Sequence, residues 1–410
     1  MRKEEYFIGL ETMGRGQGYQ GKKRNRRRRR QNSNGKKVII IAVSLVILAL
    51  LVVGGIFLGT KMCAEPDADP SSPTGTTAGE TTPDETVATT APVTTAPTEP
   101  KDVITQFDAE DDGSEAAVYS DTMFLYKNTG YNLFGSSEKI AKHYANSLNK
   151  AVKGLDKDIT VYNIVVPNHT EYGVPQKIIT DLGGSSQAEN IKTINKNLDE
   201  RIIQVNAYNI LAEHSDEYIY FNTDHHWTGL GAYYGYTAFC EEAGLTPMDI
   251  KSAKKNSIAG FTGTFTSTIP SLANTPDTVD YYSLPVDTYA YLTERGSNET
   301  LTVDTYYPGA TAGTYSYGVF CWGDVAEFII HSNAGTGRKV ALVKDSYGNA
   351  FAPYLAANYD EVHLIDFRYW NGDNFKSYLK QNGITEVIIL NNTMSANSPT
   401  QVDTLADLLS

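Results

Sequence analysis

Between residues 338 and 392, three short apolar runs alternate with two segments of helical spacing. The apolar runs span 340–343, 362–367 and 386–390, and the segments between them span 350–358 and 374–381. Strands and helices that take turns along a chain form a parallel sheet with helices on both of its faces. The sequence therefore predicts an α/β fold, in which ligands bind at the carboxyl edge of the sheet.

The preceding part of the chain continues this alternation less regularly. We expect strands at 118–126, 160–167 and 218–222, and helices at 138–152, 189–204 and 229–243. Residues 260–317 differ, because they are rich in Thr, Tyr, Gly and Pro and contain only short alternating runs. They predict a β-rich insertion outside the core of the domain.

Charge divides the chain into two unlike parts. The first 37 residues contain 13 basic and 3 acidic residues, a net charge of +10, whereas the remainder contains 22 basic and 45 acidic residues, a net charge of −23. A basic run can bind nucleic acid, but this one ends against the uncharged apolar segment 38–59. We interpret residues 1–37 as a cytoplasmic tail placed by the positive-inside rule, and we expect no nucleic-acid partner.

The segment 38–59 is long enough to cross a bilayer core of roughly 30 Å. It is longer than the apolar core of a signal peptide, so we expect an uncleaved transmembrane helix that leaves the rest of the chain outside the cell. Residues 60–101 are mostly Thr, Pro, Ser, Ala and acidic residues, and they predict a disordered linker. We assign 102–410 to one extracellular α/β domain.

A candidate nucleophile lies just after the run 340–343. The segment 345–349 (DSYGN) separates this run from the helix expected at 350–358. This order places Ser346 at the carboxyl edge of the sheet and near a helix N-terminus, where free N–H groups stabilise developing negative charge. A serine needs a base, usually a histidine that a carboxylate holds in one tautomer. Alternatively, Ser346 only caps the helix.

A candidate base and its carboxylate occur together in another loop. Asp224 and His226 are separated by one residue and lead into the helix 229–243, for which Thr228 is the expected N-cap. An extended Asp-x-His segment puts both side chains on the same side of the backbone. The carboxylate can then bind one imidazole nitrogen and leave the other facing Ser346. We expect this pair, too, at the carboxyl end of a strand.

The motifs 223–227 (TDHHW) and 344–348 (KDSYG) resemble the two signatures of the bacterial DHHW proteins. That family is similar to the SGNH-hydrolase-like O-acetylation proteins of alginate biosynthesis. The resemblance covers about 118–392, and the segments 260–265 (GFTGTF) and 365–369 (IDFRY) also resemble family segments. It implies an SGNH-like α/β fold whose Ser-His-Asp triad moves acetyl groups to or from glycan hydroxyls.

On this resemblance Asp224 orients the base, His226 is the base and Ser346 carries the acyl group. The implied activity is that of an O-acetyltransferase or acetylesterase acting on a cell-wall polysaccharide or exopolysaccharide. The two activities differ in whether a sugar hydroxyl or water reaches the acyl-enzyme. The resemblance also implies a multi-pass membrane acyltransferase as the acetyl donor. We expect no cofactor and no metal ion.

Several polar residues at the same edge are candidates for supporting roles. Asn168 and Asn391 each follow an expected strand and are possible oxyanion donors, as is the backbone N–H of Ser346. Arg368 forms either a structural ion pair with Asp366 or a contact that binds substrate or holds the loop, and the sequence leaves these alternatives open.

The neighbours of these residues have simpler expected roles. We expect Trp227 to pack beside the triad rather than to stack on a sugar, although it remains a candidate substrate contact. We expect His225 to point into the protein or to contact backbone, Asp345 to brace its turn, and His169 to be a solvated loop residue.

Two other classes of protein remain as alternatives. Adjacent histidines after an aspartate also occur in manganese-dependent phosphoesterases, but such a site needs further carboxylates that the sequence does not supply. A non-catalytic surface protein that binds glycans would also suit the abundance of tyrosine, 27 in the whole chain. Cys240 and Cys321 either form a disulfide or remain free thiols, and the apolar helix around Cys240 slightly favours free thiols.

Overall fold

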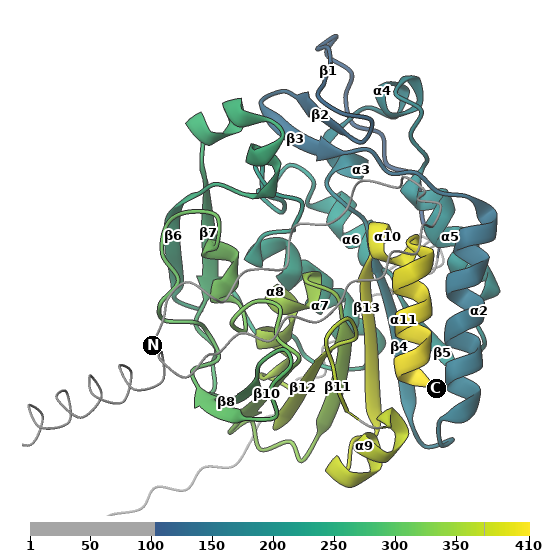
Figure 1. Ribbon diagram of the computed structural model, residues 1–410, viewed down its shortest axis with the longest axis vertical. Helices are drawn as coiled ribbons and strands as arrows, with labels where there is room; N and C mark the ends of the chain where they lie inside the picture. Colours follow the sequence, from purple (N-terminus) through teal and green to yellow (C-terminus); the bar gives the residue numbers. More distant parts are fainter. Residues whose placement is uncertain (1–102, 373) are drawn as a thin grey trace, which may run out of the picture. The chain divides into compact units, whose positions relative to one another are not determined.

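The computed structural model describes residues 103–372 and 374–410 (Figure 1). The predicted tail 1–37, transmembrane helix 38–59 and linker 60–101 lie outside the described residues. No helix in the described part is both long enough and apolar enough to span a membrane.

An eight-stranded sheet forms the centre of the described domain, in the order β5-β4-β13-β11-β12-β10-β8-β9. The first five strands are parallel to one another. The pairs β12–β10, β10–β8 and β8–β9 are antiparallel. This mostly parallel sheet confirms the α/β class. The strands are β4 (Thr160–Val166), β5 (Ile202–Val205), β8 (Thr288–Thr293), β9 (Thr300–Val303), β10 (Glu327–Ser332), β11 (Lys339–Lys344), β12 (Glu361–Asp366) and β13 (Glu386–Asn392).

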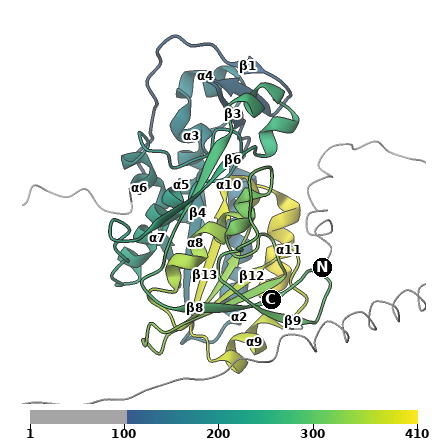
Figure 2. The same cartoon turned by 90° about the vertical axis from the view of Figure 1, so that its left-hand side faces the viewer.

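Helices cover the sheet in two groups. One group is a series of contacting helices, α5 with α2, α2 with α11 and α11 with α9, and the other joins α6, α7 and α8. Figure 2 places α7 and α8 on the opposite side of the sheet from α11. The helices are α2 (Glu138–Gly154), α5 (Gln187–Asn197), α6 (Ala207–Glu213), α7 (Gly229–Glu242), α8 (Tyr347–Leu355), α9 (Phe375–Asn382) and α11 (Pro399–Leu409).

Smaller elements complete the domain. Three strands, β1 (Ala117–Val118), β2 (Met123–Tyr126) and β3 (Thr129–Asn132), form one small sheet, and β6 (Lys255–Phe261) and β7 (Asp277–Tyr282) form another. The short helical segments are α3 (Thr170–Gly173), α4 (Gln176–Asp181), η1 (Thr264–Ser267), η2 (Pro270–Asn274), η3 (Ser316–Val319) and α10 (Thr393–Ala396).

The central strands form where the sequence is continuously apolar. Val340, Leu342, Val387 and Ile388 on β11 and β13 are completely buried, because helices cover both faces of the sheet. Full burial of such a side chain contributes about 1.5–3 kcal/mol. Both strands end at the same edge, where their polar residues meet.

One predicted helix is too long. The segment 189–204 was expected to be a single helix, but α5 ends at Asn197 and the chain enters the edge strand β5. The polar turn 199–201 separates the two elements, and Ile202, Ile203 and Val205 favour a strand. The apolar residues of β5 were mistaken for a continuation of the helical spacing of α5.

The predicted strand at 218–222 is wrong. Its residues Ile219, Tyr220 and Phe221 are buried, but they join no sheet. Instead the chain turns back on itself: the Phe221 N–H donates to the His226 carbonyl, and Tyr220 and Trp227 form an isolated bridge. Asp224 and His226 therefore lie in a narrow reversal of the chain and not at the end of a sheet strand.

The segment 260–317 is β-rich, but it is not outside the core as predicted. Its strands β8 and β9 extend the central sheet through β10, a strand that the sequence did not predict. Ala290 and Leu292 of β8 are almost fully buried. Cys321 follows this segment, and both it and Cys240 are buried free thiols.

Candidate active site

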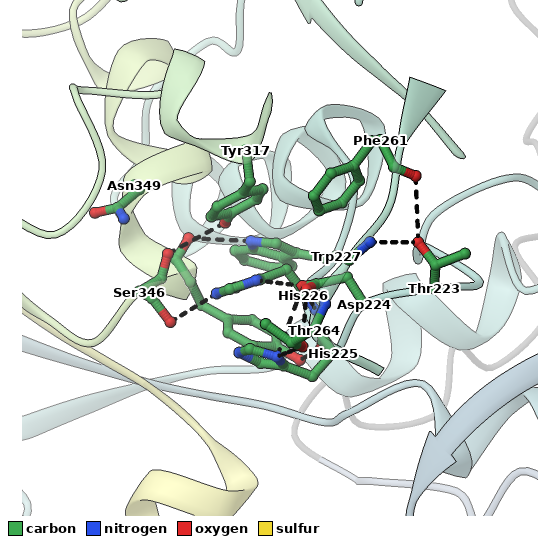
Figure 3. Close-up of polar contacts among 12 residues, drawn as sticks. Thr223, Asp224, His225, His226, Trp227, Phe261, Thr264, Tyr317, Ser346 and Asn349 are labelled. Atoms are coloured by element: carbon green, nitrogen blue, oxygen red, sulfur yellow. Dashed lines mark hydrogen bonds and ion pairs between the residues drawn. The ribbon is translucent and has the colours of Figure 1, made fainter. Parts of the chain in front are cut away.

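Three side chains that the two motifs singled out form one chain of hydrogen bonds (Figure 3). Ser346 Oγ lies 2.7 Å from His226 Nε2, and His226 Nδ1 lies 2.6 Å from Asp224 Oδ1. A carboxylate only accepts, so Nδ1 carries the hydrogen and Nε2 offers a lone pair to the serine hydroxyl. Ser346 precedes α8 without capping it through its side chain, so the simpler interpretation as a helix cap is not supported.

The second oxygen of Asp224 is held by a residue from far along the chain. The Thr264 N–H and hydroxyl both donate to Asp224 Oδ2, at 2.8 and 2.9 Å. Burial alone would raise the pKa of Asp224, but the adjacent His225 and His226 and these hydrogen bonds hold it well below its usual range. The carboxylate is therefore ionised and fixed in orientation.

Close backbone packing allows this contact. A Cβ atom on Gly263 would lie 2.3 Å from the Cβ of Asp224 and 2.5 Å from the Thr223 carbonyl oxygen. Behind them, the buried carboxylate of Asp277 accepts hydrogen bonds from the Thr223 N–H and hydroxyl at 2.7 and 2.6 Å. Gly263 and Asp277 thus hold the Asp224 loop against η1.

Aromatic rings cover both faces of the His226 imidazole. Tyr317 stacks on it with a centroid separation of 4.0 Å and an interplanar angle of 15°, and the His225 ring lies 3.9 Å away at 37°. Figure 3 shows these two rings on opposite sides of His226. The Tyr317 hydroxyl also donates to the Ser346 carbonyl at 3.1 Å. These contacts fix the plane of the imidazole.

Tyr347 joins the two loops of the site. Its hydroxyl donates to the His225 carbonyl, and its own carbonyl accepts from Trp227 Nε1 at 3.0 Å. Trp227 is fully buried, so it packs as expected and offers no ring face to a sugar. The His225 side chain is half-buried, so it points only partly into the protein, and its backbone carbonyl is bound by Tyr347.

Asp345 braces the turn before α8. Its carboxylate accepts from the Tyr347 N–H at 2.9 Å, and from the N–H and side-chain amide of Asn392 at 2.8 and 2.9 Å. Burial raises the pKa of this carboxyl. The turn that carries Ser346 is therefore attached to the end of the neighbouring strand β13.

Arg368 belongs to a cluster of ion pairs beneath the turn. It donates to both oxygens of Asp366 at 2.8 and 2.6 Å and lies 2.9 Å from Asp324, while Lys344 lies 2.8 Å from Asp366. Asp324 also accepts from the side-chain amide of Asn349 at 2.9 Å. The structural ion pair is therefore present, and the cluster contacts the helix that follows Ser346.

The two asparagines lie at the carboxyl ends of β4 and β13, as the sequence predicted. In the described part, neither Asn168 nor Asn391 has a hydrogen bond to Ser346. Asn168 binds the Thr170 N–H and Gln187, and Asn391 binds Tyr144. The side-chain nitrogen of Asn168 is buried and has no hydrogen-bond partner among the described residues, so an oxyanion role for these amides stays a prediction.

His169 is half-buried, whereas the sequence predicted a solvated loop residue. Its ring stacks on Tyr220 at 5.0 Å, its Nδ1 atom is buried, and burial lowers its pKa to about 4. This contact could not be predicted, because its partner Tyr220 comes from the chain reversal that was predicted as a strand.

The sequence also left Thr264, Tyr317 and Asp277 without a role at this site. Thr264 belongs to the segment 260–265, which resembles a family segment, and this resemblance was the one available signal. Tyr317 was one tyrosine among many in the insertion, and nothing in the sequence distinguished it.

Asp224, His225 and His226 also place potential metal-ligand atoms within 4.8 Å of one another. This cluster contains a single carboxylate, and both of its oxygens already accept hydrogen bonds. Both nitrogens of His226 are engaged as well. The arrangement fits hydrogen bonding better than a metal centre.

The fold and these contacts define an α/β protein in which a serine at the carboxyl edge of a mostly parallel sheet is hydrogen-bonded to a histidine and, through it, to an aspartate from a separate loop. The model of the DHHW protein family matches residues 83–365, and the chain belongs to this family. The family resemblance of the two motifs is thereby confirmed.

Two solved structures are similar to this chain. A DHHW family protein from Eubacterium siraeum has 29% sequence identity and a TM-score of 0.65, covering 72% of this chain and 99% of that chain. Bacillus cereus PatB1 with a sulfonyl adduct has 17% identity and a TM-score of 0.58, covering 70% of this chain and 98% of that one, and is similar in fold.

A third match is weaker. The O-acetyltransferase domain of Pseudomonas putida AlgJ has 10% identity and a TM-score of 0.37, covering 72% of this chain and 99% of that chain. A likeness this weak does not establish a shared fold. None of the curated proteins compared with the chain matches it significantly.

Proposed function

We propose that this protein transfers or hydrolyses acetyl esters on glycan hydroxyls, with Ser346 as the nucleophile. The observation that carries this proposal is the hydrogen-bond chain from Asp224 Oδ1 through His226 to Ser346 Oγ, with distances of 2.6 and 2.7 Å. A serine activated by a histidine that a carboxylate orients is suited to acyl transfer.

The steps follow from these contacts. Ser346 Oγ attacks the acetyl carbonyl carbon while His226 Nε2 takes its proton, and the same proton then passes to the leaving oxygen. This leaves an acetyl ester on Ser346. An incoming hydroxyl, from a sugar or from water, gives its proton to His226 and attacks the ester, and the proton returns to Ser346 Oγ. Asp224 stabilises the imidazolium in both steps.

The oxyanion that forms in each step needs a donor. The Tyr347 and Gly348 N–H groups are already bound by Asp345. This leaves the N–H of Ser346 itself, at the beginning of α8, as the backbone donor that we assign to the oxyanion.

The proposal also includes the segments that precede the domain and the source of the acetyl group. We propose that 38–59 anchors the chain in the cell membrane with residues 1–37 in the cytoplasm, and that 60–101 extends the domain toward a cell-wall polysaccharide or exopolysaccharide. The proposed acetyl donor is a multi-pass membrane acyltransferase. No cofactor is required by these steps.

Hydrolysis of an aryl acetate by residues 102–410 tests the proposal. We expect turnover by the wild type and a loss on the order of 10⁴-fold or more in Ser346→Ala, with Ser252→Ala as a control at an exposed serine. The similar PatB1 structure contains a sulfonyl adduct, so a sulfonyl fluoride is a second probe. Equal turnover in both serine variants would exclude Ser346. Glycan binding without turnover by the wild type would indicate a binding protein.

A further inference from the structure

His225 has no part in the proposed steps, although it lies directly against the base. Its ring centroid is 3.9 Å from that of His226. Its side chain is 32% exposed, whereas that of His226 is 10% exposed. A partly exposed imidazole beside a reactive serine is available to a bound substrate.

The hydrogen bonds around His225 decide which nitrogen carries its proton. The Thr264 hydroxyl donates its single hydrogen to Asp224 Oδ2 at 2.9 Å, because a carboxylate can only accept. The Thr264 oxygen must therefore accept from His225 Nδ1, which lies 3.0 Å away. Among the described residues, His225 Nε2 has no hydrogen-bond partner and keeps a free lone pair. Burial, and then the charge of His226, lower the pKa of His225 to about 4, so the ring is neutral at pH 7.

The orientation of this free nitrogen is visible in Figure 3. One nitrogen of the His225 ring faces Thr264, and the other is turned toward the side of the site where Ser346 lies. Tyr347, the residue after the proposed nucleophile, donates to the His225 carbonyl and fixes that backbone. One imidazole bound to Asp224 directly and one bound to it through Thr264 thus present two acceptor nitrogens on the side of Ser346.

We propose that His225 Nε2 accepts a hydrogen bond from the hydroxyl adjacent to the one that reacts, so that the acetyl group passes preferentially to vicinal diols. This inference rests on the proposed function and defines the class of acceptor. Sugar rings carry hydroxyls on neighbouring carbons, whereas water and simple alcohols do not.

The second hydroxyl orients the acceptor and exchanges no bond. The reacting oxygen attacks the carbonyl carbon of acetyl-Ser346 and gives its proton to His226 Nε2. The bond from the carbonyl carbon to Ser346 Oγ breaks, and the proton passes to that oxygen. The neighbouring hydroxyl keeps its proton throughout and donates only a hydrogen bond to His225. One such bond corresponds to about a tenfold preference.

A partition experiment on the domain tests this acceptor preference. An aryl acetate serves as the donor, and cyclohexanol, trans-1,2-cyclohexanediol and 1,4-cyclohexanediol compete as acceptors, with products quantified by mass spectrometry. We expect the wild type to favour the 1,2-diol over the 1,4-diol about tenfold per hydroxyl. All products arise from one acetyl-enzyme, so differences in the rate of its formation cancel.

Variants at His225 separate hydrogen bonding from packing. His225→Phe keeps a ring against His226 but has no acceptor, and we expect its preference for the 1,2-diol to fall to about one. His225→Gln keeps an acceptor oxygen and should retain part of the preference. His214→Phe is the control, because His214 also stacks on an aromatic ring, that of Tyr234, but at the surface.

Different failures have different meanings. If the wild-type acetyl-enzyme treats the two diols alike, or if His225→Phe keeps the full preference, the acceptor role of His225 is wrong and the acyl transfer stands. If no acetyl group is found on Ser346 of the wild type, the proposed function and this inference are overturned together. The wild-type preference tests the inference even if His225→Phe fails to fold.

Discussion

The indole nitrogen of Trp227 donates a hydrogen bond to the carbonyl oxygen of Tyr347 at 3.0 Å. Trp227 follows the proposed base His226 directly, and Tyr347 follows the proposed nucleophile Ser346 directly. One buried contact therefore joins two loops that are 120 residues apart in the sequence. We expect the distance between base and nucleophile to depend on it.

Replacement of Trp227 by phenylalanine tests this contact. The variant leaves the Tyr347 carbonyl without its donor, so we expect the free energy of unfolding to fall by about 1–3 kcal/mol and kcat to fall about tenfold. Trp322→Phe is the control, since Trp322 donates a similar bond to Asp304 at 2.8 Å. Denaturant unfolding and aryl acetate turnover measure both effects. Unchanged kcat in Trp227→Phe would show that the contact does not set the site geometry.

Gly263→Ala examines the close packing behind Asp224. The backbone of Gly263 has a φ of −70°, which alanine also adopts, so strain comes only from the new methyl group. This group would lie 2.3 Å from the Cβ of Asp224 and must displace it. We expect kcat to fall about 10²-fold. Gly135→Ala is the control, because its Cβ would meet no atom within 4 Å. Equal activity in the two variants would contradict the packing argument.

Asp224→Asn should remove activity without removing the fold. The two donors of Thr264 retain the amide oxygen, so the amide nitrogen must face His226 Nδ1. His226 then carries its hydrogen on Nε2 and cannot take the proton of Ser346. We expect kcat to fall by roughly 10³–10⁴-fold.

The control for this variant is Asp403→Asn, since Asp403 pairs with His143 at the surface at a similar distance, 2.8 Å. Circular dichroism confirms that each variant folds. If Asp224→Asn turned over substrate as fast as the wild type, the Asp224 carboxylate would have no part in the mechanism.

The lowered pKa of His169 should make the folded protein less stable in mild acid. Burial lowers its pKa to about 4 in the folded protein, whereas an unfolded histidine titrates near 6.5. Between these pH values the unfolded state binds a proton that the folded state does not. The free energy of unfolding therefore falls as pH falls from about 6.5 to 4, by up to about 1.4 kcal/mol per pH unit for this group.

The variant His169→Phe isolates this contribution. His225 and His363 also have pKa values lowered to about 4, so the wild type combines three such groups. Phenylalanine keeps a ring against Tyr220 but cannot titrate. Denaturant unfolding between pH 4 and 7 should show a smaller slope in the variant, and identical slopes would mean that folding does not lower the pKa of His169.

Local patterns predicted the elements that stand at the edge of the sheet. The apolar run before Ser346 and the helix after it could be found because both depend on neighbouring residues. The Asp-x-His spacing likewise indicated that Asp224 and His226 act together. The strand predicted at 218–222 failed because buried residues in a chain reversal have the same apolar pattern as residues in a sheet.

Long-range partners could not be predicted in the same way. Thr264 lies 40 positions from Asp224, and its contact follows from the course of the insertion rather than from any periodicity. Tyr317 is placed on His226 by the short helix η3. The sequence contains these side chains but not the tertiary packing that brings them to the site.

The most direct test of the account is mass spectrometry of the domain after brief exposure to an aryl acetate at low pH, followed by proteolysis. We predict one acetyl group on the peptide that contains Ser346. It should be absent in Ser346→Ala and present in a much smaller fraction of the peptide in Asp224→Asn. An acetyl group found equally in Ser346→Ala, or turnover of the ester with no acetyl group ever found on Ser346, would contradict it.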